Sequence, residues 1–172
     1  MNDITLLPFL EFEVRLGKIG TRGFCTDIGK NAFEQIKNVL DPYEWKNKTF
    51  SEYTDVYYDD IRCTLGTENI IIKKNLLKED ISCDPFDFRV CISQELPAKL
   101  KKKQTFERHK KRFTFNTTRW CIDLTEVTCT DSITYECEFE FKDIHYIRTH
   151  SFDYLKSSAI EELKNILLCT NI

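Results

Sequence analysis

The sequence predicts a mainly β fold of about eight antiparallel strands, with one helix after the first strand and another after the last. Stretches in which apolar and polar residues alternate recur from residue 9 to residue 141. Short loops containing Gly, Asn, Asp or Ser separate many of them, as in sheets built from successive hairpins. Many evenly spaced strands are typical of closed barrels and of sandwiches, and this pattern leaves the choice between the two open.

Residues 9–16 are predicted to form the first strand, because their apolar and polar side chains alternate. A helix of about ten residues follows, in which apolar side chains recur at helical spacing. Pro42 ends this run, because proline cannot continue a helix. The side chains expected on the buried face of the helix are Phe33, Ile36 and Leu40.

The remaining strands are predicted in residues 49–53, 56–65, 69–77, 86–93, 105–115, 120–127 and 133–141. The C-terminal helix is predicted over residues 153–168, with Ser157 or Ser158 available as its N-cap. One face of this helix is apolar and consists of Ile160, Leu163, Ile166 and Leu167. Two amphipathic helices therefore need an apolar surface on which to pack.

Length and composition indicate one globular domain that covers residues 1–172, because 41% of the residues are hydrophobic and can form a core. The formal net charge of −3 argues against a broad basic surface for nucleic acid. Any contact with nucleic acid is therefore expected to be local, at an end or in a pocket, and no contact with DNA is expected. No apolar run is long enough to span a membrane, so no membrane partner is expected.

Eight Cys residues are present, but none forms a Cys-x-x-Cys pair or a cluster with zinc-ligand spacing. The N-terminal residues lack the basic and apolar regions of a secretory signal. The thiols are therefore expected to be reduced and to pack as small hydrophobic groups.

Five of the predicted strands carry charged or polar side chains at every second position. The opposite face is apolar in four of them, and in the strand at 105–115 it consists of His109, Lys111 and Phe113. The charged and polar faces consist of Glu11, Glu13 and Arg15; Asp87, Arg89, Ser93 and Glu95; Arg108, Lys110 and Arg112; Cys121, Asp123 and Thr125; and Glu136, Glu138, Glu140 and Lys142. In an ordinary small barrel these faces would point into solvent, around an apolar interior. If the two helices cover the outside of a barrel instead, the charged faces point into its lumen. The sequence pattern allows both arrangements.

A charged lumen would have a specific chemical use. Two like charges about 4 Å apart repel by on the order of 4 kcal/mol at an effective dielectric constant near 20. A cluster formed by Glu11, Glu13, Glu138 and Glu140 would therefore need a divalent cation, and carboxylate oxygens suit Mg²⁺ or Mn²⁺. Arg and Lys side chains on the facing strands would find their counter-ion in a phosphate chain. Such a site is suited to the transfer of a phosphoryl group to water.

Five motifs occur in the order LEFEVRLG, DFRVCISQE, RHKKR, IDLTEV and YECEFEF, between residues 10 and 141. In this order they resemble the metal-dependent RNA 5′-triphosphatases of mRNA capping, of the fungal, protozoal and large-DNA-virus type, which belong to the triphosphate tunnel metalloenzymes. The resemblance implies an α+β, mainly β fold: an eight-stranded antiparallel closed barrel, the triphosphate tunnel, with a charged lumen and helices packed outside. It also implies removal of the γ-phosphate from triphosphate-ended RNA and, with Mn²⁺, hydrolysis of free NTP.

The resemblance also assigns roles to individual residues. It implies a metal set of Glu11, Glu13, Glu138 and Glu140, in which Glu138 can act through metal-bound water. It implies that Arg62, Lys110 and Arg112 bind the γ-phosphate, that Arg89 assists them, and that Glu95 orients or deprotonates the attacking water. The supporting residues that it implies are Arg15, Lys73 or Lys74, Asp87, Arg108, Asp123, Thr125 and Glu136.

Two other functions remain open at this stage. A tunnel enzyme could act on inorganic tripolyphosphate or thiamine triphosphate, although those relatives usually carry Glu-x-Glu-x-Lys in the first strand, where this chain has Arg15. A non-catalytic, polyphosphate-binding scaffold subunit of a capping complex is the other alternative. For the capping enzyme, the expected partner is an RNA guanylyltransferase. The expected location is the nucleus of a eukaryotic cell, or the viral factory or cytoplasm for a viral protein.

Overall fold

The computed structural model describes residues 7–67, 69–99, 104–170 and 172. The described residues form nine strands and three helices. In chain order these are β1 (Leu10–Gly20), β2 (Gly23–Cys25), α1 (Lys30–Leu40), β3 (Asn47–Tyr58), β4 (Ile61–Thr64), β5 (Ile70–Ile81), β6 (Asp87–Pro97), β7 (Phe106–Asn116), β8 (Trp120–Cys129), β9 (Ser132–Phe141), α2 (Ile144–Thr149) and α3 (Phe152–Leu168).

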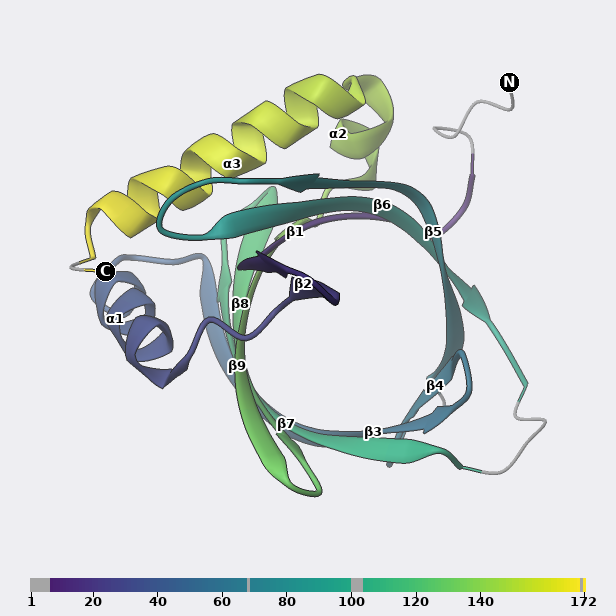
Figure 1. The fold of residues 1–172 in the computed structure, drawn as a ribbon. Coiled ribbons are helices and arrows are strands. Elements are labelled where there is room, and N and C mark those ends of the chain that lie inside the picture. Colours follow the sequence, from purple (N-terminus) through teal and green to yellow (C-terminus); the bar gives the residue numbers. More distant parts are fainter. Residues whose placement is uncertain (1–6, 68, 100–103, 171) are drawn as a thin grey trace.

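Eight of the strands form a closed antiparallel barrel. They pair in the order β1-β6-β5-β4-β3-β7-β8-β9, and β9 then pairs back with β1 from Phe12↔Phe141 to Arg15↔Glu138. Figure 1 shows the resulting ring of strands, viewed close to the barrel axis. The prediction of a closed barrel is confirmed, and the sandwich is excluded because the β1–β9 pairing joins the two ends of the sheet.

The strand β2 is an addition to this barrel that the sequence pattern does not predict. It pairs with the last residues of β1, from Lys18↔Cys25 to Gly20↔Gly23. The chain therefore folds back closely over β1 at Gly17. A Cβ atom at Gly17 would collide with the carbonyl oxygen of Cys25 and the ring of Phe24. Glycine is thus required at this close approach of two backbone segments.

The hairpin between β3 and β4 corrects the predicted strand boundaries. The stretches 49–53 and 56–65 were expected to be separate strands, but the first belongs to the long strand β3 and a turn divides the second. Asp59 adopts a positive φ of 57° in this turn, a backbone conformation that Asp tolerates better than most residues. The Asp-Asp pair at 59–60 therefore interrupts what alternation alone presents as one continuous strand.

The apolar face predicted for α1 is confirmed, whereas two of the four residues predicted for α3, Ile160 and Ile166, are only partly buried. The predicted helix boundaries also differ in part from those observed. In α1 the expected residues Phe33, Ile36 and Leu40 are all buried. The helix α3 begins at Phe152, and the Ser151 hydroxyl caps it by accepting a hydrogen bond from the Tyr154 amide at 3.2 Å. The predicted caps at Ser157 and Ser158 are therefore wrong, since both residues lie inside the helix. The short helix α2 was not predicted.

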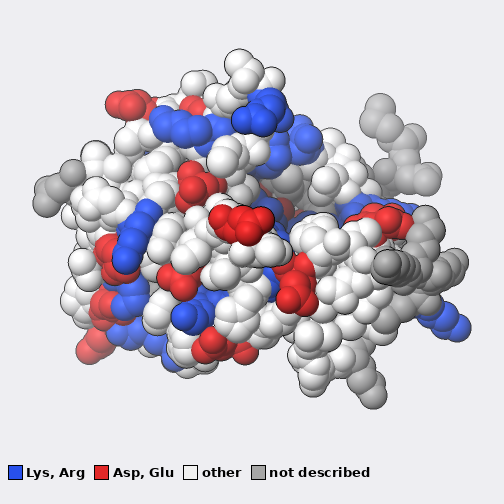
Figure 2. Space-filling view, turned by 60° about the horizontal axis from the view of Figure 1, so that its bottom comes forward, with Lys and Arg blue, Asp and Glu red and all other residues white. Residues whose placement is uncertain are grey.

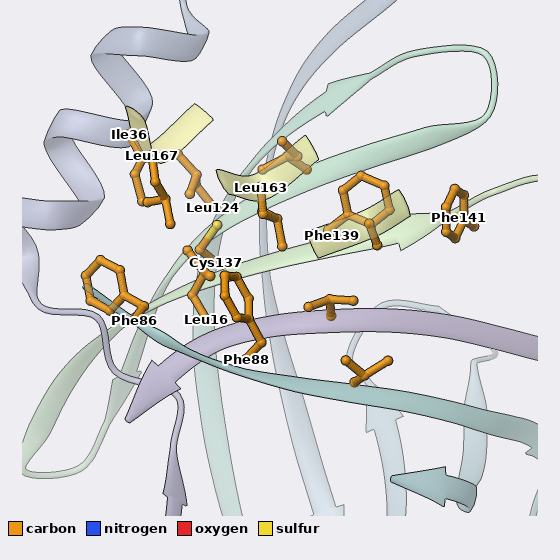
Figure 3. Packing of buried hydrophobic residues seen from close by; sticks show 14 of the residues in the cluster. Leu16, Ile36, Phe86, Phe88, Leu124, Cys137, Phe139, Phe141, Leu163 and Leu167 are labelled. Carbon is orange, nitrogen blue, oxygen red and sulfur yellow. The ribbon is translucent and has the colours of Figure 1, made fainter. Parts of the chain in front are cut away.

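The apolar core lies between the outer face of the barrel and the helices, as Figure 3 shows for strands β1, β6, β8 and β9. Phe12 and Phe139 on the barrel have no solvent exposure, and neither has Ala159 on α3. Aromatic rings in contact, such as those of Phe139 and Phe141 with centroids 5.0 Å apart, fill this layer. The helices therefore cover the aromatic strand faces, so the charged faces must point into the lumen.

The helices lie along one side of the barrel (Figure 1). Part of the outer face of β3 and β7 is exposed, and Phe50 on this face is 55% accessible. On the surface shown in Figure 2, cationic and anionic side chains are interspersed in small groups. No helix in the described part of the chain is long and apolar enough to cross a membrane.

Candidate active site

The barrel encloses a cavity of about 260 Å³ that is lined almost entirely by charged side chains. The strands β1, β7 and β9 each contribute three alternate residues to it, because successive side chains on a strand point to opposite faces. The acidic residues that line it are Glu11, Glu13, Asp60, Glu95, Glu136, Glu138 and Glu140. The basic residues are Arg15, Arg62, Lys73, Arg108, Lys110 and Arg112. Tyr57 and Ile71 complete the lining.

Glu11, Glu13, Glu138 and Glu140, here called the acidic wall, lie on the adjacent strands β1 and β9. Glu13 lies directly opposite Glu140 in the register of these strands and is only 6% exposed. Lys73 of β5 contacts this wall, with its Nζ atom 2.9 Å from a Glu13 oxygen and also bonded to Glu11. Of the two candidate lysines, Lys73 therefore faces the lumen, whereas Lys74 is exposed.

Glu140 is the carboxylate of this wall that pairs with Lys142. Burial raises its pKa to about 7, although the Lys142 ammonium group, 2.6 Å away, opposes the shift. Among the described residues, Cys121, Asp123 and Glu140 place one ligand atom each within 4.8 Å of one another. The donors around Glu140 are thus mainly carboxylate oxygens, which fit a hard divalent cation such as Mg²⁺ or Mn²⁺.

Arg108, Lys110 and Arg112, here called the basic wall, share the inner face of β7. A carboxylate holds each of them in place. Arg108 donates to Glu136 at 2.6 Å, and Arg112 donates to Asp123 at 2.9 Å. Lys110 is 4% exposed and pairs at 2.7 Å with Asp55, which is also buried. These pairs fix the cations in orientations from which they can bind a phosphate chain.

Glu138 connects the two walls. It lies 2.9 Å from Arg15 and 3.5 Å from Arg112. Burial alone would raise the pKa of Glu138, but these two guanidinium groups lower it to about 2. Glu138 is therefore ionised and oriented by two arginines. Its contacts favour a role in holding the network, and its place among the metal ligands stays a prediction.

Glu95 and Arg62 form a pair at 3.0 Å, at the edge of the acidic wall. Burial and the neighbouring Glu11 carboxylate raise the pKa of Glu95 above its usual value. A carboxylate with a raised pKa is a better proton acceptor near neutral pH than an ordinary surface glutamate. This environment fits the role predicted for Glu95, which is to orient or deprotonate a water molecule.

Two residues predicted for the site lie at one end of the barrel and do not line the cavity. Arg89 donates two hydrogen bonds to Asp80, at 2.7 and 2.8 Å, and its guanidinium lies 4.6 Å from the Phe24 ring centroid. Asp87 accepts from the backbone amides of Ile19 and Cys83. These contacts hold the β1–β2 turn against β6. The catalytic role of Arg89 stays a prediction.

Asp123 and Thr125 support the basic wall from β8 without lining the cavity. Both accept hydrogen bonds from Arg112, at 2.9 and 3.0 Å. On the neighbouring strand, Glu136 accepts from Arg108 and from the Thr26 hydroxyl. The predicted supporting role of all three is consistent with these contacts.

Sequence reasoning missed Asp55, Tyr57 and Asp60. Asp55 anchors Lys110, whereas Tyr57 and Asp60 line the cavity. The alternation of Tyr53, Asp55 and Tyr57 would have placed these side chains on one face of β3. This signal was hidden because the stretch was divided into two predicted strands at the wrong place.

A closed antiparallel barrel with a carboxylate wall that faces a cationic wall across its lumen defines a tunnel-type triphosphatase. The family model described as "mRNA capping enzyme, beta chain" matches residues 31–167. The chain therefore belongs to this family of mRNA triphosphatases. It is a phosphohydrolase that acts on the 5′-triphosphate ends of RNA in mRNA capping.

The fold agrees with solved structures of S. pombe Pct1 RNA triphosphatase. One, in complex with the Spt5 CTD, has a TM-score of 0.76 and 17% identity, and the match covers 93% of this chain and 86% of that chain. Another, of the same protein, has a TM-score of 0.75 and 17% identity, covering 95% and 85% of the two chains. No curated protein sequence matches the chain.

Proposed function

We propose that this RNA 5′-triphosphatase releases the γ-phosphate with the help of Mg²⁺ or Mn²⁺ held by Glu11, Glu13 and Glu140, and that it also hydrolyses free NTP with Mn²⁺. The observation that supports this proposal is the pairing of opposite walls in one small cavity. Seven carboxylates, six from glutamate and one from aspartate, line it together with six cationic side chains. A triphosphate brings the negative charge that satisfies the cations, and a divalent cation satisfies the carboxylates.

The chain's own residues perform distinct tasks in this mechanism. Lys110, Arg112 and Arg62 bind the γ-phosphate and stabilise the charge that it develops during transfer. Arg108 binds the phosphates nearer the RNA. Glu95 orients the attacking water and accepts its proton. The divalent cation, when bound, supplies further electrostatic stabilisation of the phosphate oxygens.

The test is a comparison of two substrates with the purified protein. Triphosphate-ended RNA and inorganic tripolyphosphate are each incubated with Mg²⁺ or Mn²⁺, and released phosphate is measured against time. We expect one phosphate per RNA end and a diphosphate-ended product. Faster release from tripolyphosphate at matched concentrations would favour the tripolyphosphatase alternative. A folded protein that releases no phosphate from RNA, tripolyphosphate or GTP would favour a scaffold role.

The biological setting is also proposed on the basis of the activity. The diphosphate-ended product is the acceptor for guanylyl transfer, so an RNA guanylyltransferase is the proposed partner. The proposed location follows the site of capping: the nucleus in a eukaryotic cell, or the viral factory or cytoplasm for a viral protein.

Metal binding is expected to depend on pH through Glu140. Burial raises the pKa of this carboxyl from 4.5 to about 7, so a cation must compete with a proton below that pH. Without metal, the stability that Glu140 contributes is fully present below about pH 4.5 and is lost as pH rises through about 7. Mn²⁺ should therefore raise the melting temperature more at pH 8 than at pH 5.5.

Thermal melts with and without Mn²⁺ at these two pH values, on the parent protein and on Glu140→Gln, measure this effect. The variant has no titrating carboxyl at this position, so the difference between the two pH values should shrink. Equal Mn²⁺-induced shifts at both pH values in the parent protein would contradict the assignment of Glu140.

A further inference from the structure

The rings of Tyr57 and Phe106 form a parallel stack inside the rim of the barrel. Their centroids are 4.4 Å apart and their planes differ by 5°. The two residues are direct cross-strand partners on β3 and β7, so their side chains share one face of the sheet. Tyr57 lines the charged cavity, so this face is the inner one. Phe106 is nevertheless 49% exposed, which places the stack at a mouth of the tunnel.

The stack continues the basic wall outward along β7. Phe106, Arg108, Lys110 and Arg112 occupy every second position of this strand, so all four point to the lumen. The rise of a strand places successive members about 7 Å apart. A ligand that extends along β7 from the mouth therefore meets an aromatic surface first and three cations after it. This order matches a nucleotide whose base remains at the mouth while its triphosphate extends inward.

The position of the stack is fixed before any ligand binds. The backbone amide and the hydroxyl of Thr105 both donate to the carbonyl oxygen of Tyr57, each at 2.8 Å. These bonds tie the start of β7 to the end of β3. Phe106 does not belong to the buried core beneath the helices. The Phe106 ring is thus about half exposed, on a strand face whose other members are cationic. Packing in the core does not explain why a large apolar side chain lies at this position.

We propose that Tyr57 and Phe106 form a stacking platform for the base of the 5′-terminal nucleotide of the RNA. This inference rests on the proposed function and adds a base-binding subsite to it. The base extends the existing stack by one ring over the exposed side of Phe106. Stacking accepts any of the four bases, because each has a π-face, so the platform selects nucleotides over inorganic polyphosphate without selecting a sequence.

The test compares three substrates on Phe106→Ala and Phe106→Trp: triphosphate-ended RNA, GTP and tripolyphosphate. Loss of one stacking contact of about 1–3 kcal/mol corresponds to a roughly 5- to 150-fold increase in KM. We expect an increase in this range for RNA and GTP with Phe106→Ala, but less than about a twofold change for tripolyphosphate, which has no base. Phe106→Trp should keep the affinity for RNA, because tryptophan retains an aromatic surface.

The matched control is Phe50→Ala. Phe50 pairs with Phe113 across the same two strands, with centroids 5.0 Å apart, but on the outer face of the barrel. It is exposed to a similar extent, at 55%. Its replacement should leave the ratio of RNA to tripolyphosphate hydrolysis unchanged. A parallel change for all three substrates with Phe106→Ala, or no change for any, would show that the stack is only a cross-strand structural contact.

A binding measurement separates this inference from the proposed function. Triphosphate-ended RNA with 2-aminopurine as its first base is titrated without divalent cation, so hydrolysis does not interfere. Stacking on the platform should quench the fluorescence with the parent protein, and Phe106→Ala should remove the quenching. If the parent protein cleaves tripolyphosphate but not RNA, the proposed function fails. The platform is then upheld or refuted by this titration and by the ratio of GTP to tripolyphosphate hydrolysis.

Discussion

Replacing Glu13 or Glu140 by alanine is expected to reduce phosphate release by at least about 100-fold while the protein remains folded. The two carboxylates face each other across the β1–β9 pairing, and each lies beside a lysine ammonium group. Removal of one takes a ligand from the proposed cation without creating a cavity in the apolar core. Lys73 keeps Glu11 as a partner when Glu13 is lost.

The measurement is the initial rate of phosphate release from triphosphate-ended RNA at saturating Mn²⁺, together with a thermal melt of each variant. Glu13→Gln retains the volume of the side chain and should be as inactive as Glu13→Ala, because a neutral amide lacks the negative charge with which a carboxylate binds Mg²⁺ or Mn²⁺. Glu34→Ala, on the exposed face of α1, is the matched control and should keep full activity. Near-normal turnover of either alanine variant would show that the metal assignment is wrong.

Replacing Phe139 by alanine should have the largest effect on stability, a loss of about 3–5 kcal/mol in the free energy of unfolding. Phe139 has no solvent exposure and packs against the rings of Trp120 and Phe141, at centroid distances of 5.1 and 5.0 Å. Its replacement leaves a cavity between the barrel and the helices that the surrounding side chains can fill only in part.

Ile133→Ala is the matched control for this experiment. Ile133 lies on the same strand, an even number of residues from Phe139, so both side chains point out of the barrel. It is 53% exposed, however, and its replacement should change the free energy of unfolding by about 0.5 kcal/mol or less. Urea titrations followed by circular dichroism measure both values. Similar small losses for the two variants would contradict a core located between the barrel and the helices.

Much of the fold and of the site follows from the sequence because a strand has a period of two. The alternation in β1, β6, β7, β8 and β9 separates charged from apolar side chains without knowledge of the fold. The helix α1 was equally predictable, because its apolar residues recur at helical spacing and Pro42 follows it. Most of the predicted site residues line one cavity, since they were chosen as members of alternating faces.

The errors have a different origin, because they lie where local conformation overrides the pattern. Asp59 adopts a positive φ, which ends β3 where alternation presents one continuous strand over residues 56–65. The predicted break at residues 54–55 is wrong, and Asp55 and Tyr57 are missing from the predicted site for that reason. The pairing of β2 with β1 depends on a close approach at Gly17, which no periodicity reveals. Arg89 has the inward-facing spacing of a lumen residue, but its partner Asp80 holds it at the barrel end.

By itself the sequence determined which side chains share a face in five of the strands, and that an ionic face lies opposite an apolar one in most of these. Only the tertiary structure decided which face lies inside. Hydrogen bonds between strands join their edges only. They therefore do not decide which of the two faces of a strand points into the barrel. The pairing of β9 with β1 closes the sheet, and the helices bury the aromatic faces from outside. Burial of those apolar surfaces is the largest favourable term in folding. Because it places the apolar faces outside the barrel, the charged faces of the same strands line the lumen.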